Sequence, residues 1–414
     1  MSTSRIHIVA CLWVLAASVS LAAPSQSLAQ KGRPAQKRSP TPAPAEQADS
    51  SEFNRLSRQA DEARAGGRLD EAIVLYNRAL KLKPRWPEGW WYLGSIFYDR
   101  DRYFEAREAL RNFLSLAPRS GSGWALVGLC EFQAREYEHA LADIRRAWTL
   151  GVGDKKEFLS VLRYHTGILL TRFEEFEPAF DYLRTFVRDG NESPRIVEAL
   201  GLNLLRMPYL PTEFPPDKRE LVLLAGRAAY FAGGLHAAEA KTAFEELRRR
   251  YPEEPNVHYA CGSFLLSSNP DAALDEFRQE LKMTPTHLPS LLQIAFEYIK
   301  RNDYEAARPF AEKSVQLAPG IVGTHHALGN VLLEMGDIPG AIKELEKGAE
   351  MAPDSPEMHF VLAKAYSRAG RKEDAARERN TFLRLDKERR TQREGAQSVG
   401  GLEAKPGDRN PPQK

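Results

Sequence analysis

The sequence predicts an all-α protein built from about nine helix-turn-helix hairpins that follow one another along the chain. The first observation is a step of 34 residues at which small side chains recur: Ala72, Ala106 and Ala140, then Ala273, Ala307, Ala341 and Ala375. The second is that prolines keep the same step, twelve residues after each alanine: Pro84, Pro118, Pro285, Pro319 and Pro353. The third is an apolar helical face, shown by Trp90, Leu93, Gly94 and Phe97.

The composition describes a chain that mostly folds. Its 414 residues are 43% hydrophobic and 28% charged, which excludes a wholly disordered or collagen-like protein. The 58 Lys and Arg residues nearly balance the 56 Asp and Glu residues, leaving a net charge of +2. This balance argues against a protein-wide commitment to nucleic acid or to an anionic membrane surface.

Residues 1–29 are predicted to be a secretory signal peptide. A short polar start is followed by an apolar run over residues 8–23, and small residues at 20–22 and 27–29 give two cleavage sites that both stay open. The run is shorter than the roughly 20 residues that span a bilayer, so a retained anchor is the less favoured alternative. We therefore expect an exported protein, periplasmic or extracellular.

The two cysteines left after cleavage, Cys130 and Cys261, are too few for a disulfide framework and are predicted to be buried.

The chain ends are predicted to carry no packed core. Residues 30–52 are rich in Pro and Ala and indicate a disordered linker, and residues 390–414 indicate a disordered tail.

Two arrays of hairpins are predicted between these ends. The N-terminal array covers residues 53–206, and the C-terminal array covers residues 219–389, with a polar capping unit at its end. The hairpins are expected to start near residues 53, 87, 121, 160, 221, 255, 288, 322 and 356. Glycines at Gly66-Gly67, Gly336 and Gly370 mark turns inside hairpins. Since one hairpin cannot bury its own apolar face, neighbouring hairpins must stack.

A proline-rich insert at residues 207–218 interrupts the register. Four prolines forbid a regular second helix after residues 194–206, while Tyr209, Leu210 and Phe214 offer apolar surface. We expect the insert to pack against the array, with ligand binding as the alternative.

The repeat resembles the tetratricopeptide repeat family, whose pattern is W-x2-L-G-x2-Y, then A-x3-F, then P. Residues 87–120 match it best, with Trp90, Leu93, Gly94, Phe97, Ala106 and Pro118, and the resemblance extends roughly over residues 53–389. It implies a right-handed superhelical solenoid that binds protein or peptide partners in its concave groove.

The candidate contact residues lie one position beyond the packed face of each first helix, about 100° around it. They are mostly aromatic, with a few polar tips that suit a peptide backbone or carboxylate. The alternative is that they pack between neighbouring first helices. The set is Trp91, Tyr98, Tyr164, Tyr259, Phe296, His326, Asn330, Phe360 and Lys364.

Other chemistries find less support. The Lys, Arg and Asn clamp with which family members hold acidic chaperone C-termini is not reproduced, because Ser57, Trp91 and Ala125 occupy its positions. His258, His325 and His359 stand at the tryptophan position of their repeats and are predicted to pack there, without forming a metal site. No cofactor motif or catalytic spacing is found in the sequence.

We therefore predict an exported, non-enzymatic scaffold that binds proteins or peptides, with no cofactor, no metal and no nucleic-acid partner. One alternative is an enzyme on an all-helical hairpin scaffold that acts on an envelope polysaccharide. Another is RNA binding by a related helical repeat, which the near-neutral charge disfavours. The oligomeric state stays open.

Overall fold

The computed structural model describes residues 44–400, and within them the chain is all-α, as predicted. It divides into two compact units, at His236 and Ala237, which are described separately. The predicted signal peptide, most of the predicted linker and the last part of the predicted tail lie outside the described residues.

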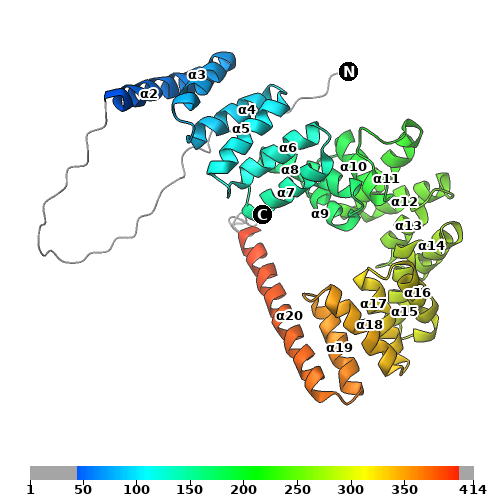
Figure 1. Ribbon diagram of the computed structural model, residues 1–414. Helices are drawn as coiled ribbons and strands as arrows, with labels where there is room; N and C mark the ends of the chain where they lie inside the picture. Colours follow the sequence, from blue (N-terminus) through cyan, green and yellow to red (C-terminus); the bar gives the residue numbers. More distant parts are fainter. Residues whose placement is uncertain (1–43, 401–414) are drawn as a thin grey trace, which may run out of the picture. The chain divides into compact units, whose positions relative to one another are not determined.

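Unit 1 contains five helical pairs, and within each pair the two helices pack against each other (Figure 1). They are α2 (Pro44–Ala65) with α3 (Leu69–Leu82), α4 (Pro87–Asp99) with α5 (Tyr103–Leu116), α6 (Gly121–Gln133) with α7 (Tyr137–Leu150), α8 (Lys156–Arg172) with α9 (Phe176–Arg188), and α10 (Pro194–Leu204) with α11 (Arg219–Gly233). A 3-10 helix, η2 (Pro216–Lys218), immediately precedes α11.

Unit 2 begins with α12 (Ala237–Arg250) and continues with four hairpins, each packed against the next. These are α13 (Val257–Leu265) with α14 (Pro270–Met283), α15 (Leu288–Lys300) with α16 (Tyr304–Leu317), α17 (Val322–Glu334) with α18 (Ile338–Met351), and α19 (Pro356–Arg368) with α20 (Lys372–Gly400). The helices α4, α6, α15, α17 and α19 start at or within one residue of the positions that the repeat predicts.

The small residues of the repeat permit close contact between the helices of one hairpin. A Cβ on Gly94 would lie 2.7 Å from Leu110 Cγ, and one on Gly329 would lie 2.5 Å from Leu345 Cγ. The helix starts are fixed by local chemistry: Asp303 and Asp337 accept hydrogen bonds from the backbone N–H of Ala306 and Gly340. Repeated apolar positions thus produce a core that runs from hairpin to hairpin along each unit.

Most turns inside the hairpins contain one residue with a left-handed backbone. The predicted turn glycines Gly67, Gly336 and Gly370 have φ of 72°, 88° and 74°. Other hairpin turns contain non-glycine residues in this conformation, which has a steric cost for them: Asp101, Arg135, Glu174 and Asn302.

The structure corrects the predicted ends of the array. Helix α2 begins at Pro44, inside the predicted linker, and α20 runs to Gly400, inside the predicted tail. Both extensions consist largely of polar and small residues, and adding residues to an existing helix is much easier than starting one. The sequence argument required an apolar face and therefore ended both helices too early.

The pairing of α10 with α11 was not predicted. The sequence indicated that α10 lacks a second helix, but α11 packs on α10. A Cβ on Gly201 would lie 1.9 Å from the Val222 carbonyl oxygen. Two facing glycines, Gly201 and Gly226, therefore let these helices meet along their backbones.

The proline-rich insert packs against unit 1, as expected. Leu210 is only 1% exposed, and the Tyr137 hydroxyl donates a hydrogen bond of 2.8 Å to Glu213. Arg172 donates a hydrogen bond of 3.1 Å to the Pro208 carbonyl. The insert is thus fixed to α7 and α8 by one apolar anchor and two polar contacts.

Candidate functional site

The two predicted contact residues of α4 lie in the packing of unit 1. Trp91 is 8% exposed, and its ring centroid lies 5.2 Å from that of Phe113 on α5. Tyr98 is half-buried against Tyr103, at a centroid distance of 5.6 Å, and burial raises the pKa of its hydroxyl. Both side chains fill space between helices and offer little surface to a partner.

Tyr164 on α8 is also occupied by its own chain. It is 8% exposed, and the guanidinium of Arg195 lies 4.0 Å from its ring centroid. The same apolar cluster includes Leu210 of the insert. In unit 1, therefore, the alternative of packing describes the predicted residues better than ligand contact does.

In unit 2 the predicted residues of α15 and α17 come together. The rings of Phe296 and His326 lie 5.9 Å apart, and Asn330 Nδ2 lies 3.2 Å from His326 Nε2. All three side chains are half-buried. Burial lowers the pKa of His326, against a weaker opposite effect of the Glu357 carboxylate, so this imidazole is neutral at pH 7 and accepts the amide hydrogen bond. The neighbouring first helices thus present an aromatic surface with an oriented carboxamide.

Tyr259 on α13 has its own set of ring contacts. Its ring centroid lies 5.0 Å from His287 in an edge-on arrangement and 5.9 Å from Phe277. The side chain is half-buried between successive hairpins.

The predicted residues of α19 differ in exposure and in charge. Phe360 is 55% exposed and touches Phe382 of α20 at a centroid distance of 5.3 Å. Lys364 forms an ion pair with Glu334 of α17, and Arg368 donates a hydrogen bond of 2.8 Å to the same carboxylate. The ammonium group is therefore engaged with Glu334, which it shares with Arg368.

The sequence analysis missed Glu334 and Arg368, although a spacing signal for such pairs exists. Opposite charges about thirty residues apart also pair in Asp70 with Arg100 at 3.1 Å and in Asp271 with Arg301 at 2.6 Å. Because the repeat step brings such residues onto neighbouring hairpins, this spacing predicts an ion pair between them.

We call Phe296, His326, Asn330, Phe360 and Lys364 the α15–α19 face. It combines an exposed phenyl ring, an aromatic pair and a carboxamide. At its end, the Glu334 carboxylate forms ion pairs with the side chains of Lys364 and Arg368. These groups can hold an apolar side chain and hydrogen-bond a backbone.

The part of the chain that the structure describes contains no group of three or more His, Cys, Asp and Glu side chains placed to hold a metal ion.

Glu131 on α6 is a buried acid at 1% exposure, and burial raises its pKa to about 6. Arg111 donates a hydrogen bond of 3.1 Å to one of its oxygens.

Among residues 44–400, no helix is both long and apolar enough to cross a bilayer.

Comparison with known families settles what the repeats are. Four segments match family models described as TPR repeat or tetratricopeptide repeat: residues 60–101, 222–254, 288–321 and 326–379. The chain belongs to the tetratricopeptide repeat family. Tetratricopeptide repeat proteins are typically non-catalytic scaffolds, and the repeats of this chain support a protein-interaction scaffold role in general.

Two curated relatives are similar to parts of this tetratricopeptide repeat protein. A TPR repeat-containing protein of Methanocaldococcus jannaschii is 22% identical over 336 residues, covering 75% of this chain and 52% of the relative. Anaphase-promoting complex subunit 3 of Schizosaccharomyces pombe is 25% identical over 149 residues, covering 36% of this chain and 22% of that protein. The chain thus spans about half the length of the first relative and less of the second.

Solved structures of MamA are also similar to part of the chain. MamA from Desulfovibrio magneticus RS-1 has a TM-score of 0.38 and 20% identity, covering 41% of this chain and 96% of MamA. A further MamA crystal structure has a TM-score of 0.37 and 14% identity, covering 41% of this chain and 94% of that one.

Proposed function

We propose that this chain is a non-enzymatic scaffold that binds a protein or peptide partner through the α15–α19 face of unit 2. The observation that carries the proposal is the run of Phe296, His326 and Asn330 across the first helices α15 and α17, together with the exposed ring of Phe360 on the next first helix, α19. In unit 1, Trp91 and Tyr164 are only 8% exposed, and Tyr98 packs against Tyr103.

The chemistry of this face favours an extended peptide segment with an apolar side chain. Phe360 supplies apolar surface that is accessible at 55% exposure, while the Asn330 carboxamide is held in place by His326. Glu334 neutralises only one of Lys364 and Arg368, so this end of the face carries one net positive charge. A partner segment with a nearby carboxylate fits that charge.

The test is a pull-down from envelope extract with the purified chain and with the variant F296A/N330A/F360A. A captured partner is then purified, and its affinity for both proteins is measured by calorimetry. We expect the variant to bind at least about tenfold more weakly, as for the loss of a central aromatic contact. The matched control is F104A, which removes an exposed phenyl ring at 67% exposure from the second helix α5.

Circular dichroism checks that each variant keeps its helical content. An unchanged affinity in the folded triple variant would move the binding surface away from the α15–α19 face. An equal loss in the control would show that general apolar exposure, and not this face, captures the partner.

We further propose that the protein is exported to the periplasm or beyond. The support is the polar start and apolar run of residues 1–29. Fusing residues 1–43 to a reporter enzyme that is active only after export tests this, with residues 30–43 alone as the control. A reporter that stays inactive with the full segment would contradict export.

A further inference from the structure

Three histidines of unit 2 occupy one repeated geometry. His258, His325 and His359 stand at the tryptophan position of their hairpins, at the start of α13, α17 and α19. In each, Nε2 faces the carbonyl oxygen of the proline six residues earlier, at 3.0, 2.9 and 3.0 Å. That proline lies between the preceding helix and the histidine's own helix, so each ring ties two successive elements together.

The tryptophans of unit 1 make the same contact. Trp90 Nε1 donates to the Pro84 carbonyl at 2.8 Å, and Trp124 Nε1 donates to the Pro118 carbonyl at 2.9 Å. A carbonyl oxygen only accepts hydrogen bonds, so Nε2 of each histidine must carry its proton as the indole nitrogen does. The histidines therefore reproduce the tryptophan contact with one nitrogen and leave a second nitrogen to be satisfied.

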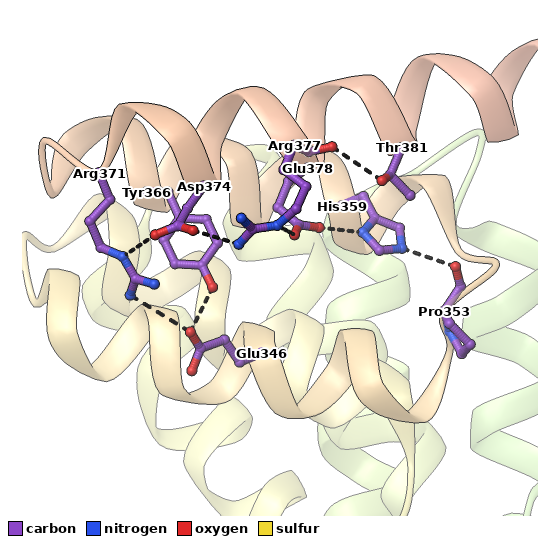
Figure 2. A network of polar contacts seen from close by, with 9 residues as sticks. All are labelled: Glu346, Pro353, His359, Tyr366, Arg371, Asp374, Arg377, Glu378 and Thr381. Atoms are coloured by element: carbon purple, nitrogen blue, oxygen red, sulfur yellow. Dashed lines mark hydrogen bonds and ion pairs between the residues drawn. The ribbon is translucent and has the colours of Figure 1, made fainter.

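That second nitrogen, Nδ1, faces a glutamate from the second helix of the same hairpin in all three cases. The Nδ1 to Oε2 distances are 2.6 Å from His258 to Glu276, 2.7 Å from His325 to Glu344 and 2.6 Å from His359 to Glu378. Figure 2 shows His359 between Glu378 and the Pro353 carbonyl. A neutral imidazole with its proton on Nε2 would point a lone pair at a carboxylate, which is repulsive.

Each pair therefore holds a proton between Nδ1 and the carboxylate. The proton can be assigned to an imidazolium beside a carboxylate, or to a carboxylic acid beside a neutral ring. In both assignments the folded pair contains one proton more than a neutral histidine and an ionised glutamate in the unfolded chain. We propose that these three pairs are proton-holding joints that tighten the hairpins of unit 2 below neutral pH and loosen them as the pH rises.

The surroundings of the three joints differ in charge. At His258, Glu276 also accepts a 2.5 Å hydrogen bond from Arg248 of α12, and Glu280 of α14 lies near the same helix start. At His359, Arg377 of α20 lies 3.8 Å from the other oxygen of Glu378 and also pairs with Asp374. Arg248 favours the ionised form of Glu276 and hence the imidazolium of His258.

His325 is 0% exposed and lies close to α18. A Cβ on Gly348 of α18 would lie 3.4 Å from the Cβ of His325 and 2.1 Å from Met358 Cε of α19. Within the described residues, Glu344 is the charged side chain in contact with this ring.

For His258, the hydrogen bond with Glu276 holds the pKa of the imidazole above its ordinary value despite burial.

The direction of the pH effect follows from proton linkage. The folded state binds more protons than the unfolded state once the pH exceeds about 6.5, where a free histidine loses its proton. The hairpins therefore become less stable toward local opening as the pH rises above that value. For each joint, the equilibrium constant for opening increases by up to about tenfold per pH unit. Below about pH 4, protonation of unfolded glutamates also removes the advantage.

The joints also lie next to candidate contact residues. His325 precedes His326 and His359 precedes Phe360 of the α15–α19 face, while His258 precedes Tyr259. Loosening a joint thus moves the first helix that carries a contact residue. The proton-holding role itself does not depend on the proposed binding function.

Hydrogen exchange of the full chain at pH 6.0 and pH 8.5 tests the joints, with exchange expressed as protection relative to an unfolded peptide at the same pH. We expect protection in α13, α17 and α19 to fall by at least about tenfold between these values. Two regions give internal controls: the tryptophan joints of unit 1, and α15, where Leu291 stands at the joint position.

The variant E276Q/E344Q/E378Q should abolish this extra pH dependence, because a glutamine can donate to the neutral Nδ1 and needs no additional proton. The matched control, E245Q/E305Q/E350Q, removes three exposed glutamates of unit 2 and should keep it. If the triple variant does not fold, E276Q and E378Q alone should each flatten the response of their own hairpin. Equal pH dependence in all helices of the wild type, or an unaltered response in the folded glutamine variants, would overturn the proposal.

Discussion

Replacing Gly226 of α11 by alanine is predicted to separate α10 from α11. A Cβ on Gly226 would lie 1.9 Å from the Val197 carbonyl oxygen, whereas such carbon–oxygen contacts need about 3.3 Å. The helices must therefore move apart by more than about 1 Å. Neither helix can yield easily, because Leu200 of α10 and Val222 of α11 are 0% exposed.

The expected cost exceeds the gain in helix propensity. Alanine favours a helix over glycine by about 1 kcal/mol, while overpacking at a fixed backbone contact costs about 3 kcal/mol or somewhat more. The net loss of about 2 kcal/mol corresponds to a roughly thirtyfold change in an opening equilibrium. G201A should behave alike, and the double variant should lose less than the sum, because the first substitution already opens the contact.

Hydrogen exchange of α10 and α11 measures this loss directly. G323A on α17 is the control, since its Cβ would meet only Leu292 at 3.8 Å, and we expect it to be neutral or slightly stabilising. Unchanged protection of α10 and α11 in a folded G226A variant would refute the argument that the two glycines set the distance between these helices.

Three further predictions concern single side chains. L210A removes the apolar anchor of the insert at 1% exposure and should cost about 2 to 4 kcal/mol locally, seen as faster proteolysis of residues 207–218 in the folded protein. E280A removes the carboxylate that accepts the backbone N–H of Asn256 at 2.9 Å and of Tyr259 at 3.2 Å, and should lower the protection of α13 by about tenfold or more, while E280Q should lose less. E131Q should stabilise unit 1 by about 1 to 2 kcal/mol at pH 7 and by little at pH 4.5. The reason is that burial raises the pKa of Glu131 from 4.5 to about 6, so the fold loses stability as the pH rises through this range. Urea unfolding at both pH values measures the difference.

The hairpins could be predicted from the sequence because their spacing is local. A small residue such as Gly94 or Gly329 must meet the second helix of its own hairpin, and this requirement recurs at every step of the repeat. The pairing of α10 with α11 could not be found in this way, because residues 205–218 separate the two helices and break the register. The extended ends of α2 and α20 depend on helix propensity without a repeated apolar face.

The candidate site was only partly predictable for a different reason. Spacing places Trp91, Tyr164 and Phe360 at equivalent positions, yet their exposure ranges from 8% for the first two to 55% for the third. What decides exposure is the neighbour supplied by another helix, such as Phe113 beside Trp91 and Arg195 above Tyr164. The first-helix stripe in the sequence therefore identifies a set of positions, and the structure shows which of them are covered by neighbouring helices.

The tryptophan position shows how one structural requirement can be met with different chemical consequences. In most of these hairpins a side-chain N–H at this position satisfies the carbonyl six residues earlier, and Trp90 and His359 both supply it. Tryptophan meets the requirement with its single nitrogen, whereas histidine brings a second nitrogen that must find a partner inside the hairpin. Glu276 lies eighteen residues after His258, and Glu344 and Glu378 lie nineteen residues after their histidines. A histidine at the tryptophan position, followed at this distance by a glutamate, is therefore a pattern from which a proton-holding joint can be predicted in a sequence before its structure is known.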